Sequence, residues 1–176
     1  METFLNRQTI YNGRILKLEL DQVKCDNGVI AYREIIRHSG GAGILCISED
    51  QKVLLIKQFR YAYNEEIYEI PAGKLEKGED PLDSAKREFE EETGHIAEEI
   101  KYLTTIYPTC GYTDEKIYLY LVTKFKVSKP HFDEDEMIES VWIDFKDVLD
   151  MIHKGTIKDA KTICAIQSYL LMRNCE

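Results

Sequence analysis

The segment from Asp80 to Gly94 constrains the fold of this chain more than any other. Asp80 is suited to the N-cap of a helix, Pro81 to its first helical position, and Gly94 to the residue that ends it. When residues are placed at about 100° intervals, the apolar residues fall within a sector about 60° wide; they are Leu82, Ala85 and Phe89. The pattern predicts an amphipathic helix over residues 81–93.

Three glutamates of this predicted helix, Glu88, Glu91 and Glu92, occupy an adjoining sector about 100° wide. Carboxylates at these spacings repel one another and weaken a helix by a few tenths of a kcal/mol per pair. A bound divalent cation would reverse that effect, because Mg²⁺ prefers oxygen ligands. From the residues alone two interpretations stay open: a metal site, or the solvated acidic face that is typical of most charge runs.

The first 38 residues are distinct from the rest of the chain. Short strand-like pieces at 9–11, 15–20 and 29–34 are separated by turn signals, Asn12-Gly13 and Asp26-Asn27-Gly28. We expect an antiparallel β-meander over residues 1–38. So small a sheet is marginal by itself, so its apolar face is expected to pack on the main body or on a second subunit.

Residues 39–176 mix strand and helix patterns without strict βαβ alternation. Strands are expected at 43–47, 53–58, 67–70, 100–107, 116–127 and 140–143, and further helices at 145–154 and 158–173. Pro71-Ala72-Gly73 is expected to break the strand before it and to begin a polar loop that runs to Glu79. Residues 39–43 lack the Lys-Ser/Thr of a phosphate loop and are expected to be a flexible approach to a strand. The fold class is α/β (α+β), with a mixed sheet covered by helices.

Composition excludes several classes of partner. The chain has 23 basic and 32 acidic residues, a formal charge of −9 and no basic stripe, so we expect no nucleic-acid binding. No apolar run is long enough for a membrane span, and the N-terminus lacks a signal-peptide pattern. The five cysteines contain no CxxC pair and indicate reduced thiols. The four histidines lack metal-ligand spacing. These histidines are His38, His95, His131 and His153. We expect a cytoplasmic protein without membrane contact.

The predicted helix belongs to a longer motif. Gly73, five residues, Glu79, seven residues and then Arg87-Glu88-Phe89-Glu90-Glu91-Glu92-Thr93-Gly94 resembles the signature of the Nudix hydrolases. His95 stands at the last motif position, which is usually apolar. Outside this motif, residues 57–60 (KQFR) and 68–76 (YEIPAGKLE) are similar to the ADP-ribose pyrophosphatase-like branch, as is the meander followed by His38-Ser39-Gly40.

The resemblance implies a Nudix-type mixed β-sheet sandwiched between helices, and hydrolysis of a nucleoside diphosphate linked to another moiety by attack of water on phosphorus. It implies that Glu88, Glu92 and the carbonyl of Ala72 bind Mg²⁺, or alternatively Mn²⁺, with Glu91 as a further ligand or catalytic helper alongside Glu92. Such metals neutralise phosphoryl charge and acidify bound water.

Three further motif residues are expected to have structural roles. Gly73 permits a sharp backbone turn at the point where a carbonyl must face the metal. Arg87 and Glu79 are expected to form a pair that ties the polar loop to the helix, because bidentate arginine pairing fixes orientation.

Residues outside the motif are candidates for binding and proton transfer. Glu115 matches the acidic loop residue near the attacking water in related enzymes, and otherwise is an exposed loop acid. Arg60 and Arg33 are candidate phosphate clamps, or else surface cations. In residues 109–111 the branch commonly has Ser-Pro-Gly; here Cys110 replaces the proline and Gly111 is retained as a substrate-binding candidate.

The leading hypothesis is a Mg²⁺-dependent ADP-sugar pyrophosphatase that converts ADP-ribose to AMP and ribose 5-phosphate. A Nudix hydrolase of another nucleotide, such as a dinucleoside polyphosphate or an oxidised nucleoside triphosphate, stays open because of Cys110. A non-catalytic ADP-ribose sensor is a third hypothesis, although such sensors generally lose the motif glutamates. Branch members commonly exchange the N-terminal sheet across a homodimer, and a two-fold dimer is expected here.

Overall fold

The computed structural model describes residues 1–130 and 138–175, and His131 therefore lies outside the described residues. The chain divides into two compact units. The first comprises Met1–Gly40 and Tyr107–Lys116, and the second comprises Gly41–Ile106 and Ile117–Glu176. The first unit therefore contains a later loop in addition to the N-terminal segment. Within the described ranges, no helix has the length and apolar character that crossing a membrane requires.

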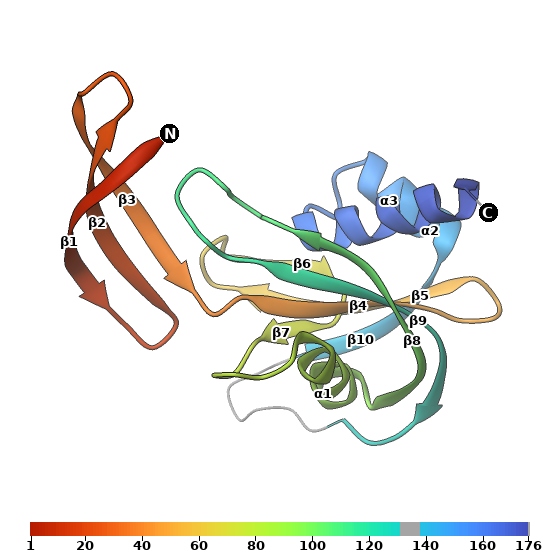
Figure 1. The fold of residues 1–176 in the computed structure, drawn as a ribbon. Coiled ribbons are helices and arrows are strands. Elements are labelled where there is room, and N and C mark those ends of the chain that lie inside the picture. The colour runs from red at the N-terminus through yellow and green to blue at the C-terminus, as the bar shows by residue number, and fades with distance from the viewer. Residues whose placement is uncertain (131–137, 176) are drawn as a thin grey trace. The chain divides into compact units, whose positions relative to one another are not determined.

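The first unit is built on a three-stranded antiparallel sheet, as the meander pattern predicted (Figure 1). Its strands in order are β1 (Glu2–Asn12), β2 (Leu16–Cys25) and β3 (Ile30–His38). The turn between the last two uses Gly28 at φ 82°, a conformation that suits glycine. The first strand begins at Glu2, well before the predicted residue 9. The prediction missed its start because all residues of the strand are exposed and show no apolar alternation.

The loop Tyr107–Lys116 pairs with the end of β3 in this unit. The Ile36 N–H donates to the Tyr112 carbonyl at 2.7 Å, and the Asp114 N–H donates to the Ile36 carbonyl at 3.2 Å. Ile36 and Thr113 form an isolated parallel bridge. These backbone hydrogen bonds hold the loop against the strand.

The second unit contains a seven-stranded mixed sheet of order β10-β5-β4-β9-β8, with β6 beside β5 and β7 beside β4. Among the described strand pairs of this sheet, only β4–β9 is parallel. The strands are β4 (Gly41–Ile47), β5 (Lys52–Arg60), β6 (Glu65–Glu69), β7 (Ala72–Lys74), β8 (His95–Ile106), β9 (Ile117–Val127) and β10 (Ile138–Asp144). The helices are α1 (Pro81–Thr93), α2 (Phe145–His153) and α3 (Ala160–Cys175).

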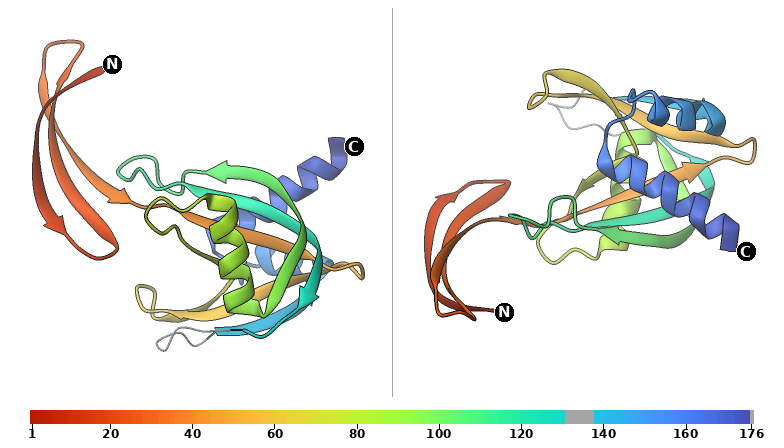
Figure 2. Two further views of the ribbon diagram at one scale, coloured as in Figure 1. Left: turned by 60° about the horizontal axis from the view of Figure 1, so that its bottom comes forward. Right: turned by 90° about the horizontal axis from the view of Figure 1, so that it is seen from above.

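Helices cover both faces of this sheet, with α1 on one side and α2 and α3 on the other (Figures 1 and 2). Strand alternation explains the two layers, because successive side chains point to opposite faces. In β4, Ile44 and Cys46 pack in the core cluster of α1, whereas Leu45 and Ile47 pack in that of α2 and α3. The predicted mixed sheet between helices is confirmed.

The ends of α1 lie where the sequence placed them. The Asp80 carboxylate accepts the Leu82 N–H at 2.8 Å, which satisfies one free donor of the first turn. Gly94 ends the helix at φ 66°, and its N–H donates to the Glu90 carbonyl at 2.8 Å. Ala85 and Phe89 are fully buried, as their spacing predicted.

Three predictions for segments of the second unit were wrong. Ala72–Lys74 is a short strand paired with β4 rather than the start of a loop, and the glycine-rich start of β4 is a buried strand rather than a flexible approach. A Cβ on Gly41 would lie 2.9 Å from the Gly73 carbonyl oxygen, so glycine permits this pairing. Strand β8 begins directly at His95 rather than at residue 100. These residues form strands because their backbones pair with neighbouring strands, and such pairing produces no apolar alternation that the sequence could reveal.

His95 packs inside the α1 layer. Its ring centroid lies 6.0 Å from that of Phe89, 5.1 Å from that of Phe125 and 5.7 Å from that of Trp142. Burial lowers the pKa of His95, although a hydrogen bond with the Thr93 carbonyl opposes this. The imidazole therefore acts as a packing group among aromatic rings.

We expect His95 to make the folded chain less stable in mild acid. Its pKa is lowered on folding, so the unfolded chain takes up a proton first, and the free energy of unfolding falls as the pH drops below about 6.5. Urea unfolding at about pH 7.5 and about pH 5.5 measures this loss. His95→Phe should reduce the loss, whereas His153→Gln, an exposed control that keeps His95, should retain it. An unchanged loss in His95→Phe would contradict the assignment.

Candidate active site

Glu92 connects α1 to the start of β7. Its side chain is almost fully buried, with 4% of its surface exposed. One carboxylate oxygen accepts the Ala72 N–H at 2.9 Å. A buried carboxylate needs hydrogen bonds of this kind, because leaving a charge unpaired in the interior is very costly. The contact holds the backbone of Ala72 beside the acidic side of the helix.

Glu88 also packs against the same strand. A Cβ added to Gly73 would lie 1.9 Å from the carboxyl carbon of Glu88 and 2.0 Å from one of its oxygens. Only glycine leaves room for the carboxylate at this position. Gly73 is therefore needed for the close packing of β7 against Glu88.

Arg87 joins three of the predicted site residues. Its guanidinium donates to both oxygens of Glu79, at 3.0 and 3.1 Å, and also to Glu88 at 2.8 Å and Glu91 at 3.0 Å. The hydrogen bond from Arg87 lowers the pKa of Glu79, and the same bond is the main reason that the pKa of Arg87 is raised. Arg87 thus links the segment before α1 to the helix and partly neutralises its acidic face.

The chemistry of these donors fits a hard divalent cation. Glu88, Glu91 and Glu92 offer carboxylate oxygens on one helix, and the backbone of Ala72 lies beside them. Among the described residues, no group of three or more His, Cys, Asp or Glu side chains is already gathered closely enough to hold a metal. Arg87 instead binds Glu88 and Glu91. Cation binding at this helix would therefore compete with the Arg87 ion pairs.

Arg60, a predicted phosphate clamp, is held by Glu69 in the same unit. The two form a bidentate pair at 2.5 and 2.8 Å, and Lys161 of α3 binds the same carboxylate. Burial alone would raise the pKa of Glu69, but hydrogen bonds and charges of the two cations lower it below its usual value. Sequence reasoning missed Glu69 and Lys161, although a charged residue next to the buried Ile70 is a signal for a paired interior carboxylate.

The other predicted residues belong to the first unit. Arg33 pairs with Glu2, with one donor at 3.2 Å. Gly111 is exposed in the loop. The Glu115 N–H donates to the Thr113 hydroxyl at 3.2 Å, and a Glu115 carboxylate oxygen lies 3.4 Å from the His38 Nδ1 atom. The structure thus groups the metal-ligand candidates with Arg60 in one unit and these three residues in the other.

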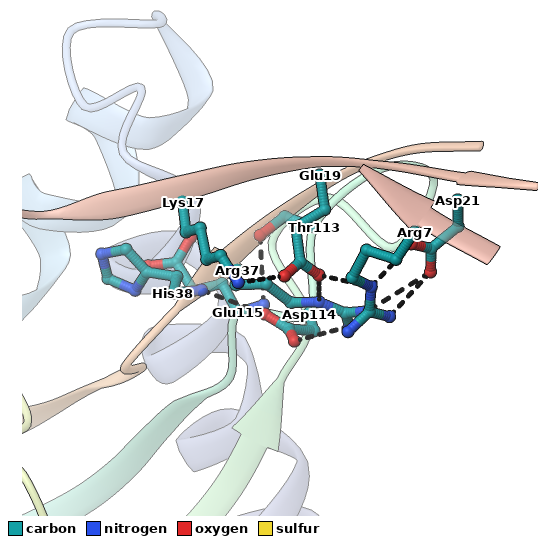
Figure 3. A network of polar contacts seen from close by, with 9 residues as sticks. All are labelled: Arg7, Lys17, Glu19, Asp21, Arg37, His38, Thr113, Asp114 and Glu115. Atoms are coloured by element: carbon teal, nitrogen blue, oxygen red, sulfur yellow. Dashed lines mark hydrogen bonds and ion pairs between the residues drawn. The ribbon is translucent and has the colours of Figure 1, made fainter. Parts of the chain in front are cut away.

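An ionic network in the first unit was not foreseen (Figure 3). Glu19 and Asp21 are buried, with 2% and 4% exposed. Arg7 binds Asp21 through two hydrogen bonds of 2.7 and 2.8 Å, and Arg37 donates to Glu19 at 2.9 Å. Two acidic residues at alternate positions of a strand share one face, and that spacing was the available signal.

Comparison with known proteins identifies the family. A family model of the NUDIX domain matches residues 37–166, which is most of the chain. The chain belongs to the Nudix family. The predicted family and pyrophosphohydrolase class are confirmed. His95 departs from the family motif, at a position where an apolar residue is usual.

Relatives of this Nudix protein match over nearly its whole length. An ADP-ribose pyrophosphatase of Bacillus subtilis (strain 168) is 37% identical over 98% of this chain and 94% of its own. The methanol dehydrogenase activator of Bacillus methanolicus is 38% identical over 94% of this chain and 91% of its own. The crystal structure of an ADP compounds hydrolase superposes with a TM-score of 0.85 at 20% identity, over 97% of this chain and 93% of that one. This last likeness confirms the fold.

We expect Gly73→Ala to weaken divalent-cation binding while the fold survives. The new Cβ would displace the Glu88 carboxylate, which is the far end of a flexible side chain and moves at low cost. Affinity for Mn²⁺, measured by titration, should fall about 10- to 100-fold, whereas the melting temperature should change little. Lys74→Ala, an exposed neighbour on β7, is the matched control. Wild-type Mn²⁺ affinity in Gly73→Ala would contradict the role of this contact.

Proposed function

We propose that this Nudix enzyme hydrolyses the pyrophosphate bond of an ADP-sugar, with ADP-ribose as the main substrate and AMP and ribose 5-phosphate as products. Water attacks phosphorus, and the reaction requires Mg²⁺, which Mn²⁺ can replace. The observation that carries the proposal is the packing of Glu88 and Glu92 against the Ala72–Gly73 backbone.

Glu88, Glu92 and the Ala72 carbonyl are the proposed metal ligands, with Glu91 as a further ligand or catalytic helper. When bound, the metal neutralises charge on the phosphoryl group and makes its water more acidic. Arg87 holds Glu88 and Glu91 on one side of the helix and keeps Glu79 beside it. The protein's own contribution is a set of three carboxylates on one helix beside the Ala72–Gly73 backbone, of which Glu88 and Glu91 exchange their Arg87 ion pairs for the cation.

Binding and proton transfer are assigned to residues outside α1. Glu115 is the proposed general base, a role that suits a partly exposed loop carboxylate. Arg60 and Arg33 are the proposed phosphate clamps, because a planar guanidinium matches phosphate oxygens. Arg60 must give up part of its pairing with Glu69 to do so. Gly111 is proposed to border the substrate, since a small residue allows close approach.

The choice of ADP-ribose rests on similarity to named relatives. The Bacillus subtilis relative carries that substrate in its name. A GDP-mannose pyrophosphatase of Yersinia pestis (strain Pestoides F), 34% identical over 82% of this chain, and Cys110 at the expected proline position favour testing other nucleotides too. Dinucleoside polyphosphates and oxidised nucleoside triphosphates belong in that test. The retained glutamates argue for an enzyme over a non-catalytic ADP-ribose sensor.

We also propose that the chain acts as a cytoplasmic homodimer formed through its N-terminal sheet, residues 1–38. A three-stranded sheet with little apolar cover is poorly stable alone, and exposed apolar patches commonly mark interfaces. The large apolar residues exposed in this segment include Phe4, Leu5, Ile10, Tyr11, Ile15, Val29, Ile30 and Tyr32. A two-fold partner would cover them.

We expect the wild-type protein to hydrolyse ADP-ribose faster than GDP-mannose, a dinucleoside polyphosphate or an oxidised nucleoside triphosphate, and only with Mg²⁺ or Mn²⁺. Glu92→Gln should lower kcat more than about 100-fold, because it removes a charged metal ligand while an amide oxygen can still accept the Ala72 N–H.

Glu90→Gln is the matched control, since Glu90 lies on the same helix but contacts Ser128. Product release followed by chromatography gives kcat and KM for each variant. Faster turnover of another nucleotide would identify that nucleotide, and not ADP-ribose, as the main substrate. ADP-ribose binding without hydrolysis of any compound would identify a sensor.

We expect light scattering to give twice the chain mass of 20.5 kDa for the wild-type protein. Leu5→Lys combined with Ile10→Lys should give the single-chain mass, because two charges would be placed in the proposed interface. Val127→Lys combined with Leu171→Lys changes two exposed apolar residues outside the N-terminal sheet and should leave the mass unchanged. A dimer in the Leu5/Ile10 variant would exclude this interface.

A further inference from the structure

We infer that Asp114 and Arg37 are positioning residues that hold Glu115 in its catalytic place. The inference rests on the proposed function, in which Glu115 is the general base. It goes further by identifying the ion pair that fixes the loop carrying this base. All the residues involved lie in the first unit (Figure 3).

Asp114, the residue directly before Glu115, uses both carboxylate oxygens to bind β3. One accepts from Nη1 of Arg37 at 2.9 Å, and the other accepts the backbone N–H of His38 at 3.0 Å. A hydrogen bond to a charged group is about twice as strong as one between neutral groups. Asp114 is therefore attached to two successive residues of the strand.

The backbone around Glu115 is restrained as well. The Asp114 N–H donates to the Ile36 carbonyl, and Ile36 donates in turn to Tyr112. The Glu115 N–H donates to the Thr113 hydroxyl at 3.2 Å. The loop is thus paired with β3 up to the residue before the proposed base, and a carboxylate oxygen of Glu115 itself lies 3.4 Å from the Nδ1 atom of His38 at the end of β3.

Arg37 is itself held by a buried carboxylate. Its Nε atom donates to Glu19 at 2.9 Å, while Nη1 of the same guanidinium donates to Asp114. Hydrogen bonds to Glu19 and Asp114 raise the pKa of Arg37, so it stays charged. Arg7 and Lys17 also bind Glu19. The buried charge of Glu19 would therefore keep cationic partners if the link between Arg37 and Asp114 were removed.

The shape of arginine suits this bridge. Separate nitrogens of one planar guanidinium contact carboxylates from two segments, β2 and the loop, whereas lysine offers a single charged atom. A general base must lie within hydrogen-bond distance of the water it activates. A displacement of about 1 Å in such a group costs about 100-fold in rate. An anchor on the adjacent residue is a direct way to prevent that displacement.

The test is a double-mutant cycle on the full-length protein with ADP-ribose and Mg²⁺. Glu115→Gln should lower kcat about 100-fold because it removes the base. Asp114→Asn should lower kcat about tenfold with KM changed less than about twofold, because the loop loses its charged anchor. Combined, the two changes should cost no more than Glu115→Gln alone, since the anchor acts only through the base.

Arg37→Lys should reproduce the effect of Asp114→Asn and should likewise have no effect when Glu115 is Gln. Asp26→Asn, an exposed carboxylate in the same unit, is the control and should keep wild-type kcat. Amide hydrogen exchange of residues 109–116 should speed up in Asp114→Asn while that of β2 stays slow. This measurement reports the anchor independently of activity.

If the losses of kcat in Asp114→Asn and Glu115→Gln multiplied in the double variant, the inference would be overturned, because Asp114 would then act independently of Glu115. Wild-type kcat in Asp114→Asn and Arg37→Lys would also overturn it. Wild-type kcat in Glu115→Gln would overturn it too, because Glu115 would then not be the base. In either case metal-dependent hydrolysis and the loss in Glu92→Gln would leave the proposed reaction and its metal ligands standing. Absence of hydrolysis by the wild-type protein would refute the proposed function itself, and the positioning role with it.

Discussion

The contact between α1 and the backbone at Ala72–Gly73 is the constraint on which the rest of the site depends. Glu92 accepts the Ala72 N–H, and the Glu88 carboxylate occupies the space where any side chain on residue 73 would lie. The contact needs a helix held firmly against the sheet, which burial of Phe89 provides. It also needs β7 to pair with the start of β4. Acidic side chains and backbone meet only when both conditions hold.

Paired carboxylates recur throughout both units. Glu19, Asp21 and Glu69 are buried, and each is bound by at least one arginine. A buried pair of this kind adds little net stability, because desolvation offsets most of the attraction, but loss of one partner is strongly destabilising. Such pairs therefore suit the fixing of geometry: they tie β2 to β1 and to β3 in the first unit, and β6 to α3 in the second.

Local signals allowed part of the structure to be predicted. The bounds of α1 were correct because its cap residues and apolar spacing act within a few residues of one another. The N-terminal meander and the mixed sheet followed from turn residues and strand patterns, whereas helices on both faces of that sheet were implied by the resemblance to the Nudix hydrolases. Strand β7 and the full length of β1 were missed, because one pairs through three backbone residues and the other is exposed on every residue. Neither leaves an apolar alternation to detect.

The sequence by itself determined the family, the helix with its three glutamates and the glycine beside them, because these depend on residue type and spacing. Only the tertiary structure decided which charges are paired: Glu69 with Arg60 and Lys161, and Arg37 with Glu19 and Asp114. Ion pairs between residues distant in the chain depend on strand register and on which side of a strand faces the interior. These are properties of the whole fold, and no local pattern encodes them.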